Sequence, residues 1–284
     1  EQSVQSPRVV HITADVSKEL PISLQEFRPT WIFNFAAVHR EPGHDFKDYF
    51  DTNIPGAKNV CQYAKQVNCK NILFTSSIAV YYPTDQPTSE NSPKYPSTGY
   101  GISKLLSENV HEIWQAEEPT RKLVICRPGV IYGPGDPGNI LRMIKAVKRG
   151  VFFFPGNPNI FKSYGYIEGL LDSFEFTMAS GEPMIHYNYV ETPTEPLNKL
   201  VEHVQTITHK KSRTISLPLF ILVPIARFIQ WLTRGKSPIH PKRVEKAATP
   251  THIIPQVLID LGFAFRYDFK KSLLDWRKKA PEDF

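Results

Sequence analysis

Apolar runs of strand length alternate with segments of helical periodicity through the first half of this chain. The continuous apolar runs cover residues 9–13, 31–37, 71–75 and 123–126. Between the last three of them, residues 46–67 and 100–117 place apolar side chains at helical spacing. Continuous apolar runs are typical of parallel strands buried on both faces, and strand–helix alternation favours a parallel sheet with right-handed crossovers. We therefore expect an α/β fold built on a parallel sheet.

Small and polar residues follow three of these predicted strands. Ala36 and Ala37 end the second run, Ser77 follows the third, and Pro128 follows the fourth. In parallel α/β sheets, ligands bind at the carboxyl ends of the strands. The sequence therefore predicts that these residues meet in one crevice.

Tyr100 and Lys104 stand four residues apart in a predicted helix, so both side chains point the same way. A free phenol has a pKa of about 10, and a nearby ammonium favours the phenolate and lowers that value. Ser77, with Ser76 as its neighbouring alternative, can meet the pair from the adjacent strand end. Such a group suits proton transfer at an alcohol or sugar oxygen while a hydride moves to or from a nicotinamide. The alternative is a surface Tyr–Lys pair beside a strand-end serine.

In these segments the chain resembles the extended branch of the short-chain dehydrogenase/reductase superfamily, whose members are nucleotide-sugar epimerases, dehydratases and reductases. The resemblance implies that Tyr100 is the catalytic acid–base. It implies that Lys104 activates Tyr100 and contacts the cofactor ribose, and that Ser77 hydrogen-bonds a substrate oxygen. It also implies a Rossmann-type domain that binds NAD(P), followed by a smaller substrate-binding domain.

The resemblance extends to further cofactor contacts. It implies that the adenine meets Asp15 and Val16, that the pyrophosphate and ribose lie beside Ala36 and Ala37, and that the nicotinamide packs on Pro128. It makes Asn53 the helix asparagine that braces the central strands. Close helix–strand packing for the alanines and a local cap for Asn53 are the structural alternatives.

The glycine-rich turn that receives a dinucleotide pyrophosphate is not found in this sequence, because no glycine precedes Gly43. We expect that the first βαβ unit of the Rossmann-type domain is missing and that this polypeptide binds NAD(P) poorly. The expected division is residues 1–132 for the incomplete dinucleotide-binding domain and residues 133–284 mainly for the substrate-binding domain.

The residues after Ser77 restrict which of the family's reactions we expect. Related dehydratases carry an Asp–Glu pair where this chain has Ile78 and Ala79, which cannot move a proton. An epimerase or keto-reductase is therefore favoured, although many epimerases have an asparagine where Val130 stands. The alternatives are a dehydrogenase of a non-sugar alcohol such as a steroid, and a catalytically silent relative.

Basic residues of the second half are candidates for a substrate diphosphate. Arg142 and Lys162 lie in segments similar to the substrate side of the family, and Arg243 is a weaker candidate. Ordinary solvated charges are the alternative for all three.

Composition restricts location and partners. A net charge of +6 without a dense basic block gives no reason to expect nucleic-acid binding. Cys61, Cys69 and Cys126 lack metal-type spacing, so we expect reduced thiols, no metal site and a cytoplasmic protein. Residues 217–232 are apolar but short and interrupted by prolines, which favours a buried helix over a membrane-surface helix and makes membrane association unlikely. A small-molecule substrate is the expected partner, with a homodimer as a further possibility.

Overall fold

The computed structural model describes residues 9–21, 24, 26–39, 43–234, 237 and 240–284. Its main sheet is parallel throughout, with strand order β1-β2-β3-β7. These strands are β1 (Ile32–Asn34), β2 (Asn71–Thr75), β3 (Lys122–Pro128) and β7 (Met184–Tyr189). The prediction of an α/β fold with a parallel sheet is confirmed.

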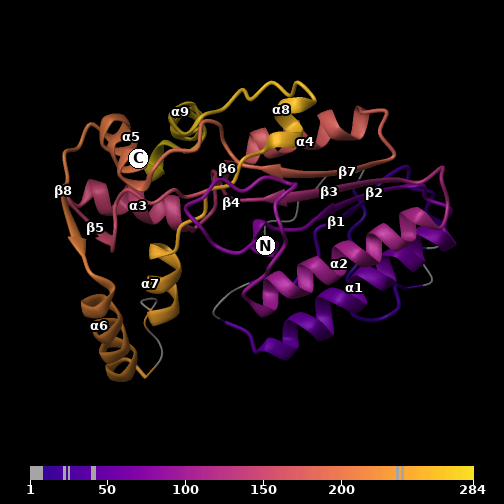
Figure 1. The fold of residues 1–284 in the computed structure, drawn as a ribbon, viewed down its shortest axis with the longest axis horizontal. Helices are drawn as coiled ribbons and strands as arrows, with labels where there is room; N and C mark the ends of the chain where they lie inside the picture. Colours follow the sequence, from indigo (N-terminus) through magenta and orange to yellow (C-terminus); the bar gives the residue numbers. More distant parts are fainter. Residues whose placement is uncertain (1–8, 22–23, 25, 40–42, 235–236, 238–239) are drawn as a thin grey trace.

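Both faces of the main sheet are covered, as the continuous apolar strands require. Ile72 and Phe74 of β2 pack toward α1 (Phe46–Gln66) and α2 (Gly99–Ala116), whereas Leu73 packs toward α4 (Ile167–Ala179). The alternation follows from the two-residue period of a strand. Figure 1 shows α1 and α2 on one side of the sheet and α4 on the other.

The two long helices match their predicted ranges closely. Asp48 accepts a hydrogen bond at 3.0 Å from the backbone N–H of Asp45 at the start of α1. Asn68 has a φ of 54° just after α1, a conformation typical of the residue that ends a helix. The Thr98 hydroxyl caps α2 by accepting from the Gly101 N–H at 3.1 Å.

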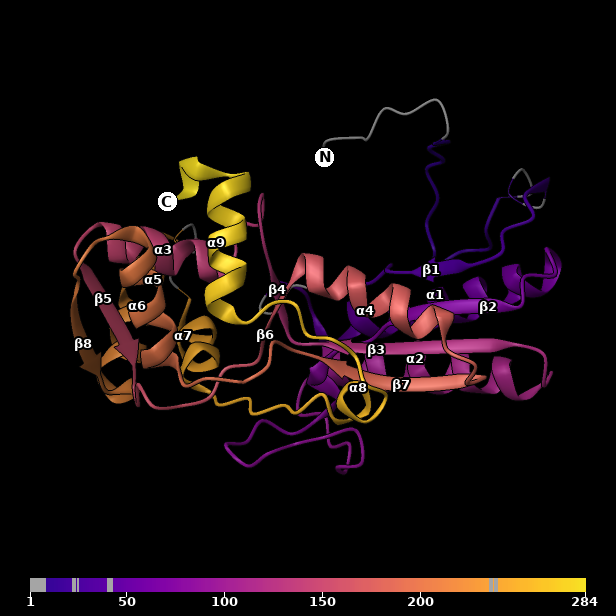
Figure 2. The ribbon, with the colours of Figure 1, turned by 90° about the horizontal axis from the view of Figure 1, so that it is seen from above.

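A second lobe lies beyond the carboxyl ends of the main sheet (Figures 1 and 2). The short parallel pair of β4 (Val130–Tyr132) and β6 (Tyr164–Tyr166) joins it to the sheet. The lobe is built from β5 (Val151–Pro155), β8 (Arg213–Leu217), α3 (Asn139–Lys148), α5 (Leu197–Thr208), α6 (Leu219–Leu232), α7 (Pro241–Ala248) and α9 (Phe269–Lys279). The remaining elements are η2 (Ile78–Val80), α8 (Gln256–Asp260) and η3 (Pro281–Asp283).

The chain does not cross between the lobes once at residue 132. After building α3 and β5 it returns to the main sheet through α4 and β7, and α8 packs beside β7. The second half of the chain therefore contributes to both lobes. It supplies residues to both sides of the edge where the lobes meet.

Two expectations about local structure are wrong. Residues 9–13 form no strand, because no described strand offers them a hydrogen-bonding partner, and Val9 and Val10 are exposed. The second predicted strand is limited to Ile32–Asn34.

The apolar segment 217–232 is also not a buried helix. It ends β8 and forms α6, in which Ala226 is the only buried residue. Packing against the lobe covers one side of α6 and leaves its other side, which is equally apolar, in solvent. Among the described residues, none of the helices combines the length and apolar character needed to cross a bilayer.

Candidate active site

The start of α2 lies directly against the carboxyl end of β2. The Lys104 ammonium donates to the Thr75 carbonyl at the last residue of β2. One turn earlier, a Cβ added to Gly101 would collide with the backbone carbonyl of Ala79 in η2. These two contacts bring the Tyr100 turn of α2 beside the Ser77 turn, as the sequence predicts.

Lys104 is an unusual lysine because only 2% of its surface is exposed. Its ammonium lies 4.2 Å from the centroid of the Phe74 ring, within cation–π range. Burial lowers the pKa of Lys104 to about 7, while the charge of Glu108 opposes that effect. A buried amine that titrates near neutrality, beside a tyrosine on the same helix face, is suited to controlling a proton.

Tyr100 is the second residue of α2 and is partly buried. Its ring centroid lies 6.1 Å from that of the buried Tyr49 on α1, which restricts where the phenol can point. Ser77 is also partly buried, and its hydroxyl accepts from the Ala79 N–H at 3.1 Å. That bond leaves the Ser77 hydroxyl proton available for donation.

The structure distinguishes Ser77, the serine that the resemblance implies, from its neighbour Ser76. The Ser76 hydroxyl is buried and donates to Glu108 at 2.5 Å, away from the turn that carries Ser77. Ser76 is therefore used within the core. This supports Ser77 as the serine that meets a ligand.

A buried ionic network supports this strand edge, and sequence reasoning missed it. Glu108 on α2 and Arg127 on β3 form a two-point ion pair at 2.8 and 2.9 Å, with 0% and 1% of their side chains exposed. Arg127 also donates to the Tyr81 hydroxyl at 2.8 Å, which donates to Asn188 of β7 at 3.0 Å. Burial lowers the pKa of Arg127, but the hydrogen bonds and charge of Glu108 outweigh it and raise the pKa overall. The network ties α2, β3 and β7 into one rigid support.

Part of this network could have been recognised from the spacing of ionisable residues along the sequence of α2. Tyr100, Lys104, Glu108 and His111 follow one another at intervals of three or four residues, which places them on one face of α2. A stripe of ionisable groups on a helix that must cover a sheet predicts internal partners for each group. The identity of Arg127 as the partner could not be read from spacing.

Asn53 braces the segment that follows β1. Its side-chain amide accepts from the Val38 N–H at 2.8 Å and donates to the Val38 carbonyl at 3.1 Å. The same amide nitrogen donates to Ser103 of α2 at 2.9 Å. The turn containing Ala36 and Ala37 is thereby fixed relative to α2. Asn53 holds this edge together from within the protein.

Asp15 and Val16 lie near the start of the described chain, against α1. The Asn59 side chain donates to the Val16 carbonyl at 2.8 Å, and the Val16 side chain packs on Gly56. The exposed Asp15 carboxylate accepts from the Ser17 N–H and hydroxyl at 3.0 and 2.7 Å, and these bonds lower the pKa of Asp15. The Asp15 carboxylate is therefore ionised and accessible for a donor such as an adenine amino group.

The candidate diphosphate contacts occupy separate places in the second lobe. Arg142 is exposed on α3 and Arg243 is exposed on α7. The Lys162 ammonium donates to the backbone carbonyls of Lys246, at 2.9 Å, and Thr249, at the carboxyl end of α7. Burial lowers the pKa of Lys162 to about 8, with the charge of Lys246 acting in the same direction. Lys162 thus anchors α7, the helix that carries Arg243, whereas Arg142 belongs to α3.

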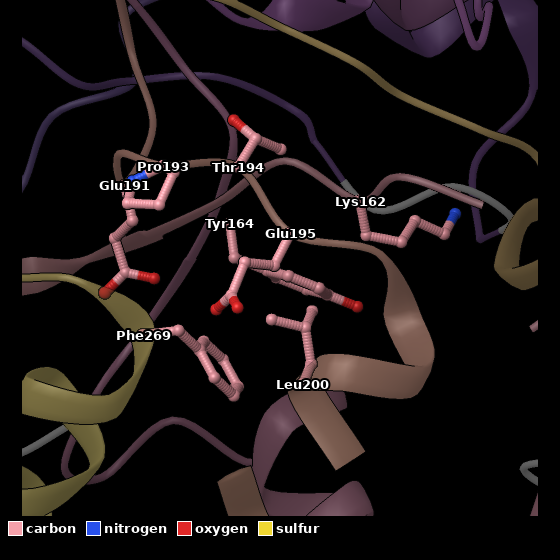
Figure 3. A pocket seen from close by; sticks show the side chains of 8 residues that line it. All are labelled: Lys162, Tyr164, Glu191, Pro193, Thr194, Glu195, Leu200 and Phe269. Carbon is pink, nitrogen blue, oxygen red and sulfur yellow. The ribbon is translucent and has the colours of Figure 1, made fainter. Parts of the chain in front are cut away.

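A small hollow beside Lys162 contains two carboxylates. Its walls come from Lys162, Tyr164, Glu191, Pro193, Thr194, Glu195, Leu200 and Phe269. Figure 3 shows that the Lys162 side chain extends away from Glu191 and Glu195. Burial raises the pKa of Glu191 to about 8, and the Tyr132 hydroxyl donates to it at 2.7 Å. Glu191 is therefore held mostly protonated at neutral pH as part of the packing of this lobe.

The sheet edge fits one half of a nicotinamide dinucleotide. Ala36 is exposed and Ala37 is half-buried, so both present small surfaces, and the buried Pro128 ends β3 behind them. Tyr100 and Lys104 supply a phenol and an amine. These groups would hold the nicotinamide and its ribose. In the described ranges no group of three or more His, Cys, Asp or Glu side chains could hold a metal ion.

A doubly covered parallel sheet with a Tyr–x–x–x–Lys helix against a strand-end serine defines the class of short-chain dehydrogenases/reductases. Within that class, the chain belongs to the NAD dependent epimerase/dehydratase family, whose model matches residues 2–188. The members of this family are NAD-dependent enzymes, so the expected class of protein and cofactor is confirmed.

Curated relatives and solved structures agree with this assignment. The chain is 31% identical over 246 residues to the N-acetyl-alpha-D-glucosaminyl-diphospho-ditrans,octacis-undecaprenol 4-epimerase of Escherichia coli O157:H7, covering 84% of this chain and 73% of the relative. It is 24% identical to 3beta-hydroxysteroid-dehydrogenase/decarboxylase isoform 1 of Arabidopsis thaliana over 81% of this chain and 55% of the plant protein. The fold is similar to that of the Bordetella bronchiseptica enzyme WbmG in complex with NAD and UDP, with a TM-score of 0.70 and 18% identity over 94% of this chain and 79% of WbmG.

Proposed function

We propose that the protein is an NAD(P)-dependent epimerase or keto-reductase that acts on a sugar carried by a diphosphate, as in a nucleotide sugar. The observation that carries the proposal is Lys104, a buried amine with a pKa of about 7 fixed to the end of β2, on the same helix face as Tyr100. The family membership and the first-named relative support a sugar diphosphate as the substrate class.

In this proposal Tyr100 exchanges a proton with the reacting sugar hydroxyl. The Lys104 ammonium favours the phenolate form of Tyr100, and the Ser77 hydroxyl donates a hydrogen bond to the same sugar oxygen. NAD(P), when bound, would supply the hydride chemistry, as acceptor and donor in epimerisation or as donor in reduction. The Glu108–Arg127 pair and Asn53 keep the three side chains in place. An epimerase needs no further acid–base group, which fits Ile78 and Ala79 after Ser77.

The carrier of the diphosphate can be a nucleoside or a polyprenol. Both present the same pyrophosphate and sugar, and the name of the E. coli relative describes the polyprenol form. Arg142 is the candidate diphosphate contact that stays exposed and clear of α7. Lys162 is a weaker candidate because its ammonium already binds two carbonyls.

The test is incubation of the protein and NAD(P) with UDP-N-acetylglucosamine, UDP-glucose and a polyprenyl diphosphate N-acetylglucosamine. Formation of the C4 epimer without net change in nicotinamide absorbance supports epimerisation. Stoichiometric oxidation of NAD(P)H with a keto-sugar supports reduction. Failure to convert any sugar diphosphate, by a folded protein that keeps Tyr100 and is shown by titration to bind NAD(P), contradicts the proposal.

A steroid or similar alcohol is the second candidate substrate. The similarity to a plant hydroxysteroid dehydrogenase favours it, although the chain spans about half the length of that relative. Turnover of a 3β-hydroxysteroid, with no response to sugar diphosphates, would select this candidate.

We further propose a cytoplasmic location and a homodimer. Free, buried Cys61, Cys69 and Cys126 support a reducing compartment. Burial raises the pKa of Cys61 and Cys126 to about 12, so these thiols resist oxidation. Sedimentation analysis of the purified protein tests the dimer.

A further inference from the structure

Helix α6 exposes large apolar side chains to an extent that no other described helix approaches. Phe220 is 78% exposed, Trp231 74%, Leu232 66% and Phe228 61%. The Phe228 and Trp231 rings lie 5.9 Å apart, so they form a continuous aromatic surface. Figure 1 shows α6 and α7 projecting together from the second lobe, away from the main sheet. A surface of this kind marks an interaction site.

The exposed side chains of α6 lie on one face. At 100° per residue, the exposed apolar residues fall within an arc of about 140°; they are Phe220, Ile221, Ile225, Phe228, Trp231 and Leu232. Ala226, the buried residue of α6, lies on the opposite side and faces the lobe. The helix therefore has a definite inward side and a definite outward apolar side.

Cations border this apolar face. Arg227 is exposed and falls at one edge of the arc, within about 20° of Phe220, and the exposed Arg234 follows just beyond the end of the helix. On the neighbouring α7, Lys242, Arg243 and Lys246 are also exposed. Between residues 203 and 259 the sequence has a single carboxylate, that of Glu245. The surroundings of the aromatic surface are therefore strongly positive.

We propose that α6 docks the protein on an anionic lipid bilayer, lying in the plane of the interface. The aromatic and aliphatic face enters the boundary between head groups and acyl chains, where Trp and Phe are favoured. Arg227 and the α7 cations contact lipid phosphates, and the long arginine and lysine side chains can reach them without leaving water. The charge complementarity selects a membrane over a second copy of this chain, because two such basic faces would repel each other.

The proposal revises the expectation of a buried helix without placing a span in the membrane. With 14 residues and an internal proline, α6 is shorter than the roughly 20 residues that a bilayer crossing needs. The sequence could not reveal the exposure, since a helix that is apolar on nearly all sides has no broad polar face to mark its orientation. Membrane docking does not depend on the reaction proposed above.

Co-sedimentation with vesicles tests the proposal. We expect the protein to bind vesicles of phosphatidylcholine with added phosphatidylglycerol, to bind phosphatidylcholine alone less, and to be released partly by salt. The double variant Phe228→Ser/Trp231→Ser should lower binding by about tenfold or more. Arg227→Gln/Lys242→Gln should reduce the preference for phosphatidylglycerol. The control Leu274→Ser removes a half-exposed apolar side chain of α9 and should leave binding unchanged.

Tryptophan fluorescence gives a second readout. Trp114 and Trp276 are fully buried and Trp31 is partly buried, so Trp231 is the tryptophan that vesicles can reach. Lipid-borne quenchers should quench Trp231, and Trp231→Phe should remove the quenching while keeping most binding. Absence of vesicle binding by the folded protein would overturn the proposal. So would equal binding by the double variant, or a dimer that the double variant dissociates while vesicles stay unbound.

Discussion

The carboxyl edge of the main sheet and helix α6 depart from the usual distribution of side chains in opposite directions. At the sheet edge, the ionic groups of Lys104, Glu108 and Arg127 are almost fully buried. In α6, Phe228 and Trp231 are mostly exposed. Each arrangement is unfavourable for an isolated domain, because burying charges and exposing aromatic rings both cost free energy. In the two proposals made above, the first arrangement serves a reacting ligand and the second serves a surface outside the protein.

Removing the phenol of Tyr100 should have the largest effect. Tyr100→Phe should lower turnover by about 10²–10⁴-fold, because the proton acceptor at the sugar oxygen is lost. Turnover on whichever sugar diphosphate proves to be a substrate measures this, with thermal unfolding as a check on the fold. Tyr82→Phe is the matched control, since Tyr82 is 64% exposed. Equal losses of turnover in both variants would show that the Tyr100 phenol has no specific role in the reaction.

Breaking the buried ion pair should destabilise the protein severely. Glu108→Gln should lower the free energy of unfolding by about 3–5 kcal/mol, because Arg127 would keep its charge without a buried partner. Glu118→Gln removes a partly exposed partner of Lys70 and should lower the free energy of unfolding far less, because solvent-exposed ion pairs contribute little. Urea denaturation of both variants measures the difference. Similar denaturation midpoints for the two variants would mean that the buried ion pair does not stabilise the carboxyl edge of the main sheet.

A buried acid of the second lobe should make stability depend on pH. The pKa of Glu191 is raised to about 8 in the folded protein, so the folded state binds more protons than the unfolded state between about pH 4.5 and 8. Stability should therefore fall as the pH rises through this window. Glu191→Gln should remove at least about 1.4 kcal/mol of that fall, the equivalent of one pKa unit.

Denaturation of both proteins at pH 5 and pH 8.5 measures the effect of Glu191. The variant should gain stability relative to the parent at the higher pH and match it more closely at the lower. A difference that is equal at the two pH values would contradict the buried-acid account.

The smallest effect on folding is expected at α6. Phe228→Ser should change the free energy of unfolding by no more than about 0.5 kcal/mol, because the ring contributes little to the packed core. Leu123→Ala, within the completely buried part of β3, should cost about 2–5 kcal/mol. A large loss in Phe228→Ser would show that α6 packs within the protein after all. Calorimetry of the two variants gives the comparison.

The sequence predicted the central helices and strands of the fold better than the segment near the start of the chain. Helices 46–67 and 100–117 were clear because their periodicity is long, and the strand at 71–75 because it is uniformly apolar. Residues 9–13 have the same local pattern, but a strand exists only with a hydrogen-bonding neighbour, which local pattern does not reveal. The grouping of the Tyr100 turn with the Ser77 turn was predicted from chain order. The resemblance favoured Ser77 over Ser76, but the core contact of Ser76 with Glu108 could be seen only in the structure, since adjacent residues of an extended chain point in opposite directions.

Long-range partners account for most of what the sequence did not show. The contact between Glu108 and Arg127 depends on how α2 crosses β3, and the attachment of Lys162 to the end of α7 joins residues more than 80 positions apart. Charge and spacing identify such residues as candidates. Only the packing decides whether a cation faces a ligand or a backbone carbonyl.

Gly101 illustrates how a residue without chemistry can set the limits of an active site. Because a Cβ at this position would collide with the Ala79 carbonyl oxygen, any side chain would push the first turn of α2 away from the strand end. A saturation screen for activity should therefore find this position as intolerant as its tyrosine neighbour, with even alanine rejected. Attempts to redesign the specificity of this enzyme should leave that backbone junction untouched and vary the walls contributed by the second lobe.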